Sequence, residues 1–263
     1  MQLSRKQYQI KKEYKILKYL DSYEIAPKAI FLDLKTFYYP LMIEEFIEGK
    51  SIKSLSRINL SKVGSIIAKL NKVQLRKDHP FKAVKPCYAR DLKWYYDIFN
   101  KIKNDKSIEE WRNKTDTAFR ELRKIVKENQ KLLNKVKPAV IRRDANPTNF
   151  ILTKNSIKLI DWEVVRVDDP TVTLASFINE VELYDYFERR LTSKQKEFLI
   201  DEYLKNNKVS RFKVLLENRL LLERIWGLVW ALERIYLFRN KRLPKNLLKK
   251  SKLRWYKMTS SPT

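Results

Sequence analysis

The sequence predicts an α+β protein in which helices dominate and strands are few. Long stretches carry apolar side chains at the three- and four-residue spacing of amphipathic helices, whereas runs rich in Ile, Phe and Tyr are short. With 44% hydrophobic residues, 12% aromatic residues and only three glycines, the chain has enough apolar surface to form a packed core. We therefore expect a folded, helix-rich globule.

The amino-terminal region predicts one helix followed by an antiparallel strand pair. Apolar residues recur at helical spacing over residues 7–20, and Pro27 then takes the chain out of the helix. Residues 28–33 and 37–46 are rich in β-forming side chains and are separated by a short polar segment. Gly49 closes the second strand.

Helical patterns dominate the middle and the carboxyl-terminal part of the chain. The middle helices are expected over residues 60–73, 91–102 and 107–133. Beyond Pro170 the pattern is helical as far as about residue 238, and Thr192 is a plausible cap for one of these helices.

Between the two helical regions lies a short β-rich segment. Residues 139–141 form an apolar run after Pro138, and residues 149–152 and 157–160 flank a polar turn, which is typical of a hairpin. We therefore expect a strand followed by a small hairpin.

The charge balance and the rare cysteine and histidine limit the classes of function. Lys and Arg number 57 against 31 Asp and Glu, a net charge of +26, so the surface should attract nucleotides, nucleic acid or anionic membranes. Cys87 and His79 are single residues of their types, which excludes an intramolecular disulfide and a Cys/His zinc site. The chain shows no secretory signal, and charged residues interrupt its most apolar segment, residues 220–238, so we expect a cytoplasmic protein without a membrane span.

Three polar residues in the β-rich segment have a spacing suited to phosphoryl transfer. Asp144 and Asn149 lie five residues apart in one loop, and Asp161 follows the hairpin. Transfer from ATP needs a carboxylate to orient the acceptor hydroxyl and oxygen ligands to hold Mg²⁺ on the phosphates. The alternative, that these are ordinary loop-capping residues, is less favoured because strand-forming runs flank them.

This stretch resembles the catalytic loop, and the following Ile-Asp-Trp-Glu, of the aminoglycoside phosphotransferase and choline kinase family, which has a protein-kinase-like fold. The resemblance implies that Asp144 is the catalytic base, that Asn149 and Asp161 are magnesium ligands, and that ATP and Mg²⁺ are the cofactors. Residues 160–163 carry the second part of the match.

The resemblance extends upstream to the nucleotide-binding region. Glu45, Phe46 and Ile47 stand where the family has the hinge whose backbone contacts adenine, and Glu13 stands where kinases have the helix Glu that pairs with a phosphate-binding Lys. Glu13 is equally well explained as a solvated partner of a neighbouring Lys.

The same resemblance implies a division into lobes. Residues 1–48 would form a truncated amino lobe with the hinge, residues 49–238 a helical catalytic lobe, and residues 239–263 a basic tail with nine basic and no acidic residues. The glycine-rich strand turn and the strand Lys that should precede Glu13 are missing. Two interpretations stay open: weak or lost activity, or further strands encoded upstream of Met1.

Three substitutions depart from the family pattern around the catalytic loop. Arg142 replaces a His two residues before the catalytic Asp, Thr173 replaces an Asp, and Asn71 replaces a His in the helix after the hinge. Because the family residues brace the loop, we expect weaker support for Asp144.

The sequence therefore predicts an ATP-dependent phosphotransferase acting on a hydroxyl of a small molecule. The alternative is a non-catalytic kinase-like scaffold that binds nucleic acid or another polyanion through its basic surface, including the tail. The acceptor itself is not specified. Asp91, Glu109 and Glu110 in the helical insert could receive an amine, although solvated helix charges are commoner.

Overall fold

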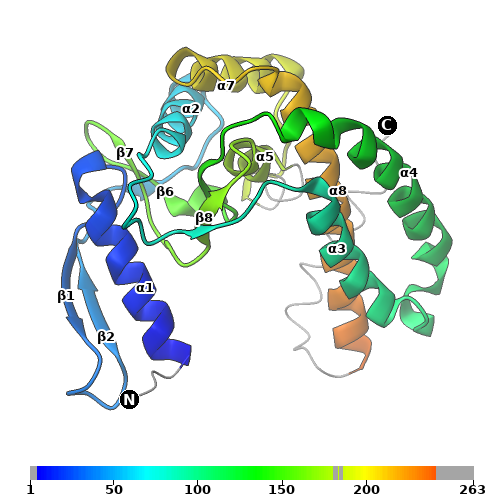
Figure 1. Cartoon of the computed structure of the whole chain (residues 1–263), viewed down its shortest axis with the longest axis horizontal. Coiled ribbons are helices and arrows are strands. Elements are labelled where there is room, and N and C mark those ends of the chain that lie inside the picture. Colours follow the sequence, from blue (N-terminus) through cyan, green and yellow to red (C-terminus); the bar gives the residue numbers. More distant parts are fainter. Residues whose placement is uncertain (1–4, 180–182, 184–185, 241–263) are drawn as a thin grey trace. The chain divides into compact units, whose positions relative to one another are not determined.

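The computed structural model describes residues 5–179, 183 and 186–240, and the chain folds into two compact units (Figure 1). The first unit consists of Met1–Lys85, Lys137–Phe177 and Leu191–Ser210, and the second of Pro86–Val136, Ile178–Arg190 and Arg211–Thr263. The predicted boundaries at residues 48 and 238 stay a prediction. Nearly all of the predicted basic tail, from residue 241 onward, lies outside the described residues.

The first unit begins with the predicted helix and strand pair. Helix α1 (Arg5–Leu20) leads through the 3₁₀ turn η1 (Asp21–Tyr23) to β1 (Ala29–Asp33), which pairs antiparallel with β2 (Leu41–Glu44). Helix α1 contacts both strands. Ile16, Leu17 and Leu20 near the end of this helix are fully buried, and Ile10 and Tyr14 on its apolar face are half-buried.

Two small three-stranded sheets follow in the same unit. One has the order β3 (Lys50–Ser51), β6 (Phe150–Leu152), β7 (Ile157–Leu159), and the other the order β4 (Lys82–Ala83), β8 (Val165–Asp168), β5 (Ala139–Arg142). The predicted strand β5 and the β6–β7 hairpin are confirmed. Strands β3, β4 and β8 were not predicted.

Helices α2 (Arg57–Asn71) and α7 (Ser193–Asn206) pack against each other in the first unit. The Thr192 hydroxyl accepts from the Gln195 N–H, and the Gln195 side chain bonds back to the Thr192 N–H, so the predicted cap is a complete capping box. Two side chains of the short helix α5 (Val172–Ile178), Thr173 and Ser176, bond the backbone at the end of β5 and in the loop after it.

The second unit is helical in the part that the structure describes. Helices α3 (Tyr88–Ile102), α4 (Glu109–Leu133) and α8 (Phe212–Arg239) contact one another, and the 3₁₀ turn η2 (Lys106–Ile108) joins α3 to α4. Their shared core contains stacked aromatic rings, among them Phe99 and Phe119 with centroids 5.8 Å apart. No helix among the described residues is long and apolar enough to cross a bilayer.

The expectation that Asp91 either receives an amine or is solvated is wrong. Asp91 is buried in the second unit, where its carboxylate forms ion pairs with Arg219 at 2.7 Å and with Arg90 at 3.0 Å. A carboxylate already neutralised by two guanidinium groups is a poor site for a further cation.

Candidate active site

The loop after β5 holds the Asp144 carboxylate in a fixed orientation. The Asn146 amide donates to Asp144 Oδ1 at 2.8 Å, and the Asn149 amide donates to Asp144 Oδ2 at 3.3 Å and to the Asp144 carbonyl at 3.2 Å. The 3₁₀ turn η3 (Pro147–Asn149) brings Asn149 back over the loop, and Asn146 caps this turn. Asp144 stays half-exposed, so its carboxylate can meet a ligand.

Two of the three substituted residues, Thr173 and Asn71, bond backbone groups of β5, the strand that leads into the loop. Thr173 Oγ accepts from the Arg142 N–H at 2.9 Å, and the Asn71 amide donates to the Val140 carbonyl at 2.8 Å. The Tyr203 hydroxyl donates to Asn71 Oδ1 at 2.8 Å and fixes that amide in turn. A hydroxyl and an amide therefore hold two backbone groups of β5, and the weaker support expected for Asp144 stays a prediction.

A second brace comes from α5. Ser176 Oγ accepts from the Ala145 N–H at 3.2 Å and donates to the Arg143 carbonyl at 2.6 Å. The backbone on both sides of Asp144 is thus held by one side chain.

Asp161 lies next to this loop and leaves its carboxylate free. The Ile160 N–H donates to the Asn149 carbonyl at 3.0 Å, which joins the segment after β7 to the loop after β5. Asp161 has a left-handed backbone with φ of 65°, is exposed, and forms no hydrogen bond or ion pair within the described residues. Positive φ is uncommon for residues other than glycine, and such conformations concentrate at functional sites.

The donor atoms of Asn149 and Asp161 fit a magnesium ion. The Asn149 amide nitrogen is directed at Asp144, and its Oδ1 accepts no hydrogen bond within the described residues. A free amide oxygen and a free carboxylate are hard oxygen ligands of the kind that Mg²⁺ takes. The described part of the chain holds no group of three or more His, Cys, Asp or Glu side chains placed to bind a metal ion.

Glu13 contacts the segment that carries Asp161. The Trp162 N–H donates to Glu13 Oε1 at 3.0 Å, so Glu13 on α1 holds the backbone directly after Asp161. Burial raises the pKa of Glu13, the Trp162 hydrogen bond opposes this shift, and the charges of Asp161 and Glu163 add to it. Glu13 is therefore not a solvated partner of a neighbouring Lys.

Glu44 belongs to the same acidic group and was missed in the sequence. Partial desolvation raises the pKa of Glu44, and the charges of Glu13 and Asp161 raise it further, although its side chain is exposed. In the predicted strand over residues 37–46, the neighbours Glu44 and Glu45 would point to opposite faces; β2 ends at Glu44, and Glu45 pairs with Lys158 instead. The opposite directions of neighbouring residues in that predicted strand were the signal that could have pointed to Glu44.

The expected hinge residues, Glu45, Phe46 and Ile47, differ in whether their backbone hydrogen-bonding groups are already paired. The Glu45 N–H donates to the Lys28 carbonyl at 2.8 Å, and its carboxylate accepts from the Lys28 N–H at 3.0 Å. The backbone groups of Phe46 and Ile47 form no hydrogen bond within the described residues. Phe46 and Ile47 therefore have donors and acceptors available for a ligand, whereas Glu45 anchors the segment.

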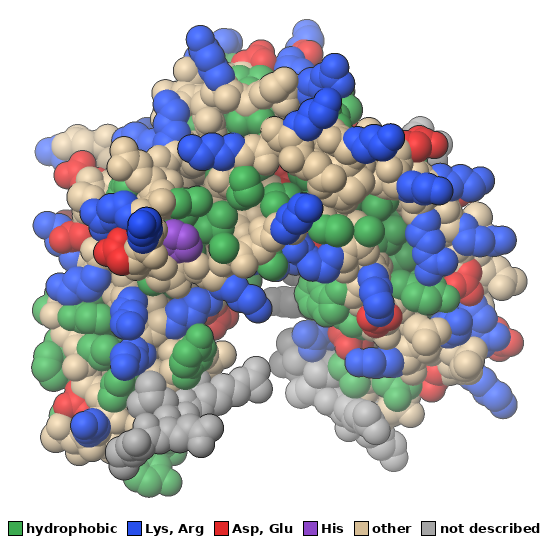
Figure 2. Space-filling view, in the orientation of Figure 1, with side chains coloured by type: hydrophobic (Ala, Val, Ile, Leu, Met, Phe, Trp, Pro, Cys, Tyr) green, Lys and Arg blue, Asp and Glu red, His purple; other side chains and the backbone are tan. Residues whose placement is uncertain are grey.

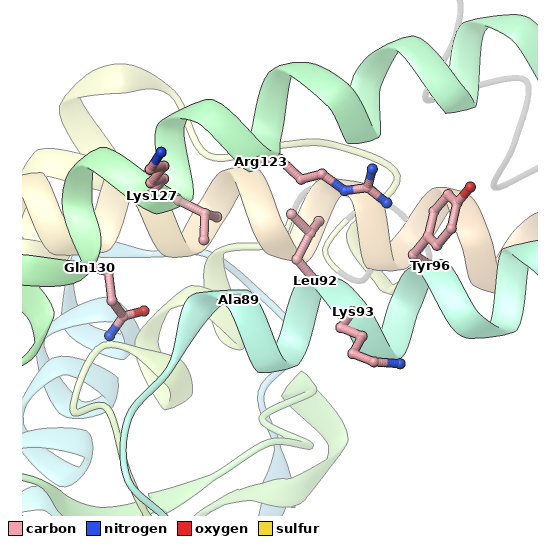
Figure 3. Close-up of a pocket in the computed structure, with 8 residues that line it drawn as sticks. Ala89, Leu92, Lys93, Tyr96, Arg123, Lys127 and Gln130 are labelled. Carbon is pink, nitrogen blue, oxygen red and sulfur yellow. The ribbon is translucent and has the colours of Figure 1, made fainter.

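The second unit contains a separate groove between α3 and α4, with a volume of about 520 Å³ (Figure 3). Leu92 and Val126 form its apolar lining, and the charged residues that line it, Lys93, Arg123 and Lys127, are all basic. Such a groove suits an anionic or neutral ligand better than an ammonium group.

Comparison with known proteins agrees with these features. A family model described as choline/ethanolamine kinase matches residues 3–250. No curated protein sequence matches the chain.

Several solved structures have folds similar to that of this chain. An ethanolamine kinase from Plasmodium vivax is 15% identical with a TM-score of 0.67, and 95% of this chain and 71% of that chain are covered. A choline kinase from Streptococcus pneumoniae is 18% identical with a TM-score of 0.60, covering 97% and 82%. A spectinomycin phosphotransferase solved with ADP and spectinomycin is 13% identical with a TM-score of 0.62, covering 96% and 79%. The predicted α+β, kinase-like fold is confirmed.

Proposed function

This chain belongs to the choline/ethanolamine kinase family, and from that premise we propose that it transfers the γ-phosphoryl group of ATP to the hydroxyl of a small molecule. One observation supports this most strongly: a half-exposed Asp144, held by two amides, lies in a loop whose Asn149 is joined by a backbone hydrogen bond to the segment carrying a free Asp161. Phosphoryl transfer depends mainly on positioning and electrostatics, which such an arrangement supplies.

In this proposal each site residue has a separate role. Asp144 orients the acceptor hydroxyl and accepts its proton as the oxygen attacks the γ-phosphorus. Asn149 and Asp161 would hold Mg²⁺, which would offset the charge that develops on the phosphates. The backbone groups of Phe46 and Ile47 bind the adenine, and Glu45 keeps that segment in place through Lys28 and Lys158.

We further propose an amino alcohol as the acceptor class, because the family is described by choline and ethanolamine. The basic α3–α4 groove is unsuited to such a cation, and Asp91 is already neutralised, so neither is its binding site. A cytoplasmic location, where ATP is available, belongs to the same proposal.

The direct test is phosphoryl transfer from ATP with Mg²⁺ to a panel of choline, ethanolamine and other small alcohols. Asp144→Asn should lower kcat by about 10²–10⁴-fold, the usual contribution of a general base, while nucleotide affinity stays unchanged. The matched control is Asp78→Asn, which removes an exposed carboxylate whose partner is the surface residue Arg76.

Two outcomes would contradict the proposal. One is an unmutated protein that binds no nucleotide with or without Mg²⁺. The other is an Asp144→Asn variant that transfers phosphate as fast as the control, since its role requires the negative charge.

A further inference from the structure

Arg142 is a buried cation at the start of the catalytic loop. It is the last residue of β5, two positions before Asp144, and its side chain is 0% exposed. Its Nε, Nη1 and Nη2 atoms form no hydrogen bond within the described residues. A buried guanidinium without hydrogen bonds is costly, so its retention calls for a compensating interaction.

The compensation comes from an aromatic ring and from several acids. The guanidinium carbon lies 5.9 Å from the centroid of the buried Trp162 ring, within cation–π range. Burial lowers the pKa of Arg142 to about 10, and the charges of Asp161, Asp144, Glu13 and Glu163 oppose this shift. Arg142 therefore carries its positive charge at neutral pH.

Glu13 connects this cation to helix α1. Its carboxylate accepts from the Trp162 N–H at 3.0 Å, and it forms no ion pair with any Lys or Arg within the described residues. The positive charge of Arg142 lowers the pKa of Glu13, whereas burial and the charges of Asp161 and Glu163 raise it. In the resembled kinases a strand Lys takes this role toward the helix Glu.

We propose that Arg142 is a positioning residue that supplies, from the catalytic loop, the counter-charge for Glu13 and Asp161. Its guanidinium offsets the repulsion between these two acids and so keeps α1 attached, through Glu13 and the Trp162 N–H, to the segment that carries Asp161. The consequence for ATP·Mg²⁺ rests on the proposed function, whereas the coupling between Arg142 and Glu13 does not.

The first test is a double-mutant cycle on thermal unfolding at pH 7.5, which needs no ligand. Arg142→Met removes the charge and roughly keeps the length, and Glu13→Gln removes the acid but keeps a hydrogen-bond acceptor for Trp162. Glu13→Gln should lower Tm less in the Arg142→Met variant than in the unmutated protein, or should raise it. The two effects of Glu13→Gln on Tm should differ by about 2–4 °C. Additive Tm shifts would overturn the proposal.

The second test measures nucleotide affinity with and without Mg²⁺. Arg142→Met should weaken Mg²⁺-dependent ATP binding at least tenfold and leave metal-free binding unchanged, and Arg142→Lys should preserve most of the affinity. Arg120→Met, at an exposed residue of α4, is the control for net charge. Equal losses for the two Arg142 variants would indicate packing against Trp162 alone and overturn the proposal.

The two tests separate this inference from the proposed function. If the unmutated protein binds no nucleotide, the proposed function fails, and the thermal cycle still decides whether Arg142 and Glu13 are coupled. If nucleotide binds normally but the cycle is additive, the proposed function stands and the role of Arg142 is wrong.

Discussion

At the scale of single residues, Asp161 combines features of its backbone, its carboxylate and its charge that suit a cation ligand. Its backbone is left-handed, its carboxylate has no partner among the described residues, and its charge raises the pKa of both Glu13 and Glu44. The left-handed backbone and the repulsion among the acids disfavour the folded state slightly, and a divalent cation would relieve that repulsion.

We therefore expect Asp161→Asn to weaken Mg²⁺-dependent ATP binding by at least tenfold and to leave metal-free binding nearly unchanged. The carboxylate is the charged ligand of the proposed metal site, and an amide keeps the shape without the charge. Calorimetric titration of ATP at several Mg²⁺ concentrations checks this. Asp144→Asn is the control, since its affinity should not change, and an equal response of the two variants would contradict the separate roles.

The sequence pointed to Asp144, Asn149 and Asp161 as candidate site residues but not to their electrostatic environment. The Asp144 and Asn149 spacing was visible because it lies within one loop, whereas the group formed by Glu13, Glu44 and Arg142 joins residues far apart in the chain. Thr173 and Asn71 led us to expect weaker support for Asp144. A residue type alone does not show that the Thr173 hydroxyl reaches the Arg142 N–H or that the Asn71 amide reaches the Val140 carbonyl.

At the scale of elements, the tight packing of α2 against α7 depends on Gly64. A Cβ at this position would lie 3.0 Å from Glu202 Cβ, from the Leu199 carbonyl oxygen and from the Tyr203 nitrogen. Two of these atoms are backbone atoms of α7, which cannot move without displacing the helix.

Gly64→Ala should therefore destabilise the protein by about 1–3 kcal/mol, the usual cost of overpacking. Alanine gains about 1 kcal/mol over glycine in helix propensity, which reduces the loss but should not cancel it. Urea unfolding followed by circular dichroism measures the change. Ser65→Ala, the next residue of α2, is the control and should stay within about 0.5 kcal/mol of the unmutated protein.

Long helices were easier to predict than short strands, for a physical reason. The helices carry several turns of apolar periodicity, as in α3 and α4, whereas β3 and β4 are two residues long and show no alternation. Strand β8 does alternate, with Val165 and Val167 buried. In the sequence, however, four such residues next to an acidic segment look like a loop, and only their pairing with β5 in the structure makes them a strand. Strand pairing is a tertiary property that a local pattern does not contain.

At the scale of the whole molecule, the excess of positive charge is the dominant feature. The net charge is +26, and Figure 2 shows Lys and Arg side chains spread widely over the visible face. A distributed charge of this size attracts any polyanion and does not require a dedicated site. It supports the alternative function, a polyanion-binding scaffold, as much as it supports ATP capture, so the two need a test that separates them.

We expect the protein to bind single-stranded oligonucleotides with an affinity that does not depend on their sequence and that falls linearly with the logarithm of the salt concentration. Removing residues 239–263 deletes nine basic and no acidic residues, so it should weaken binding to all sequences alike and flatten the salt dependence. Fluorescence anisotropy at several salt concentrations measures both quantities. An unchanged slope would show that the tail is not involved.

Saturating ATP·Mg²⁺ should displace little of the oligonucleotide if the kinase site is separate from the diffuse basic surface, whereas full displacement would place both ligands at one site and favour the scaffold interpretation.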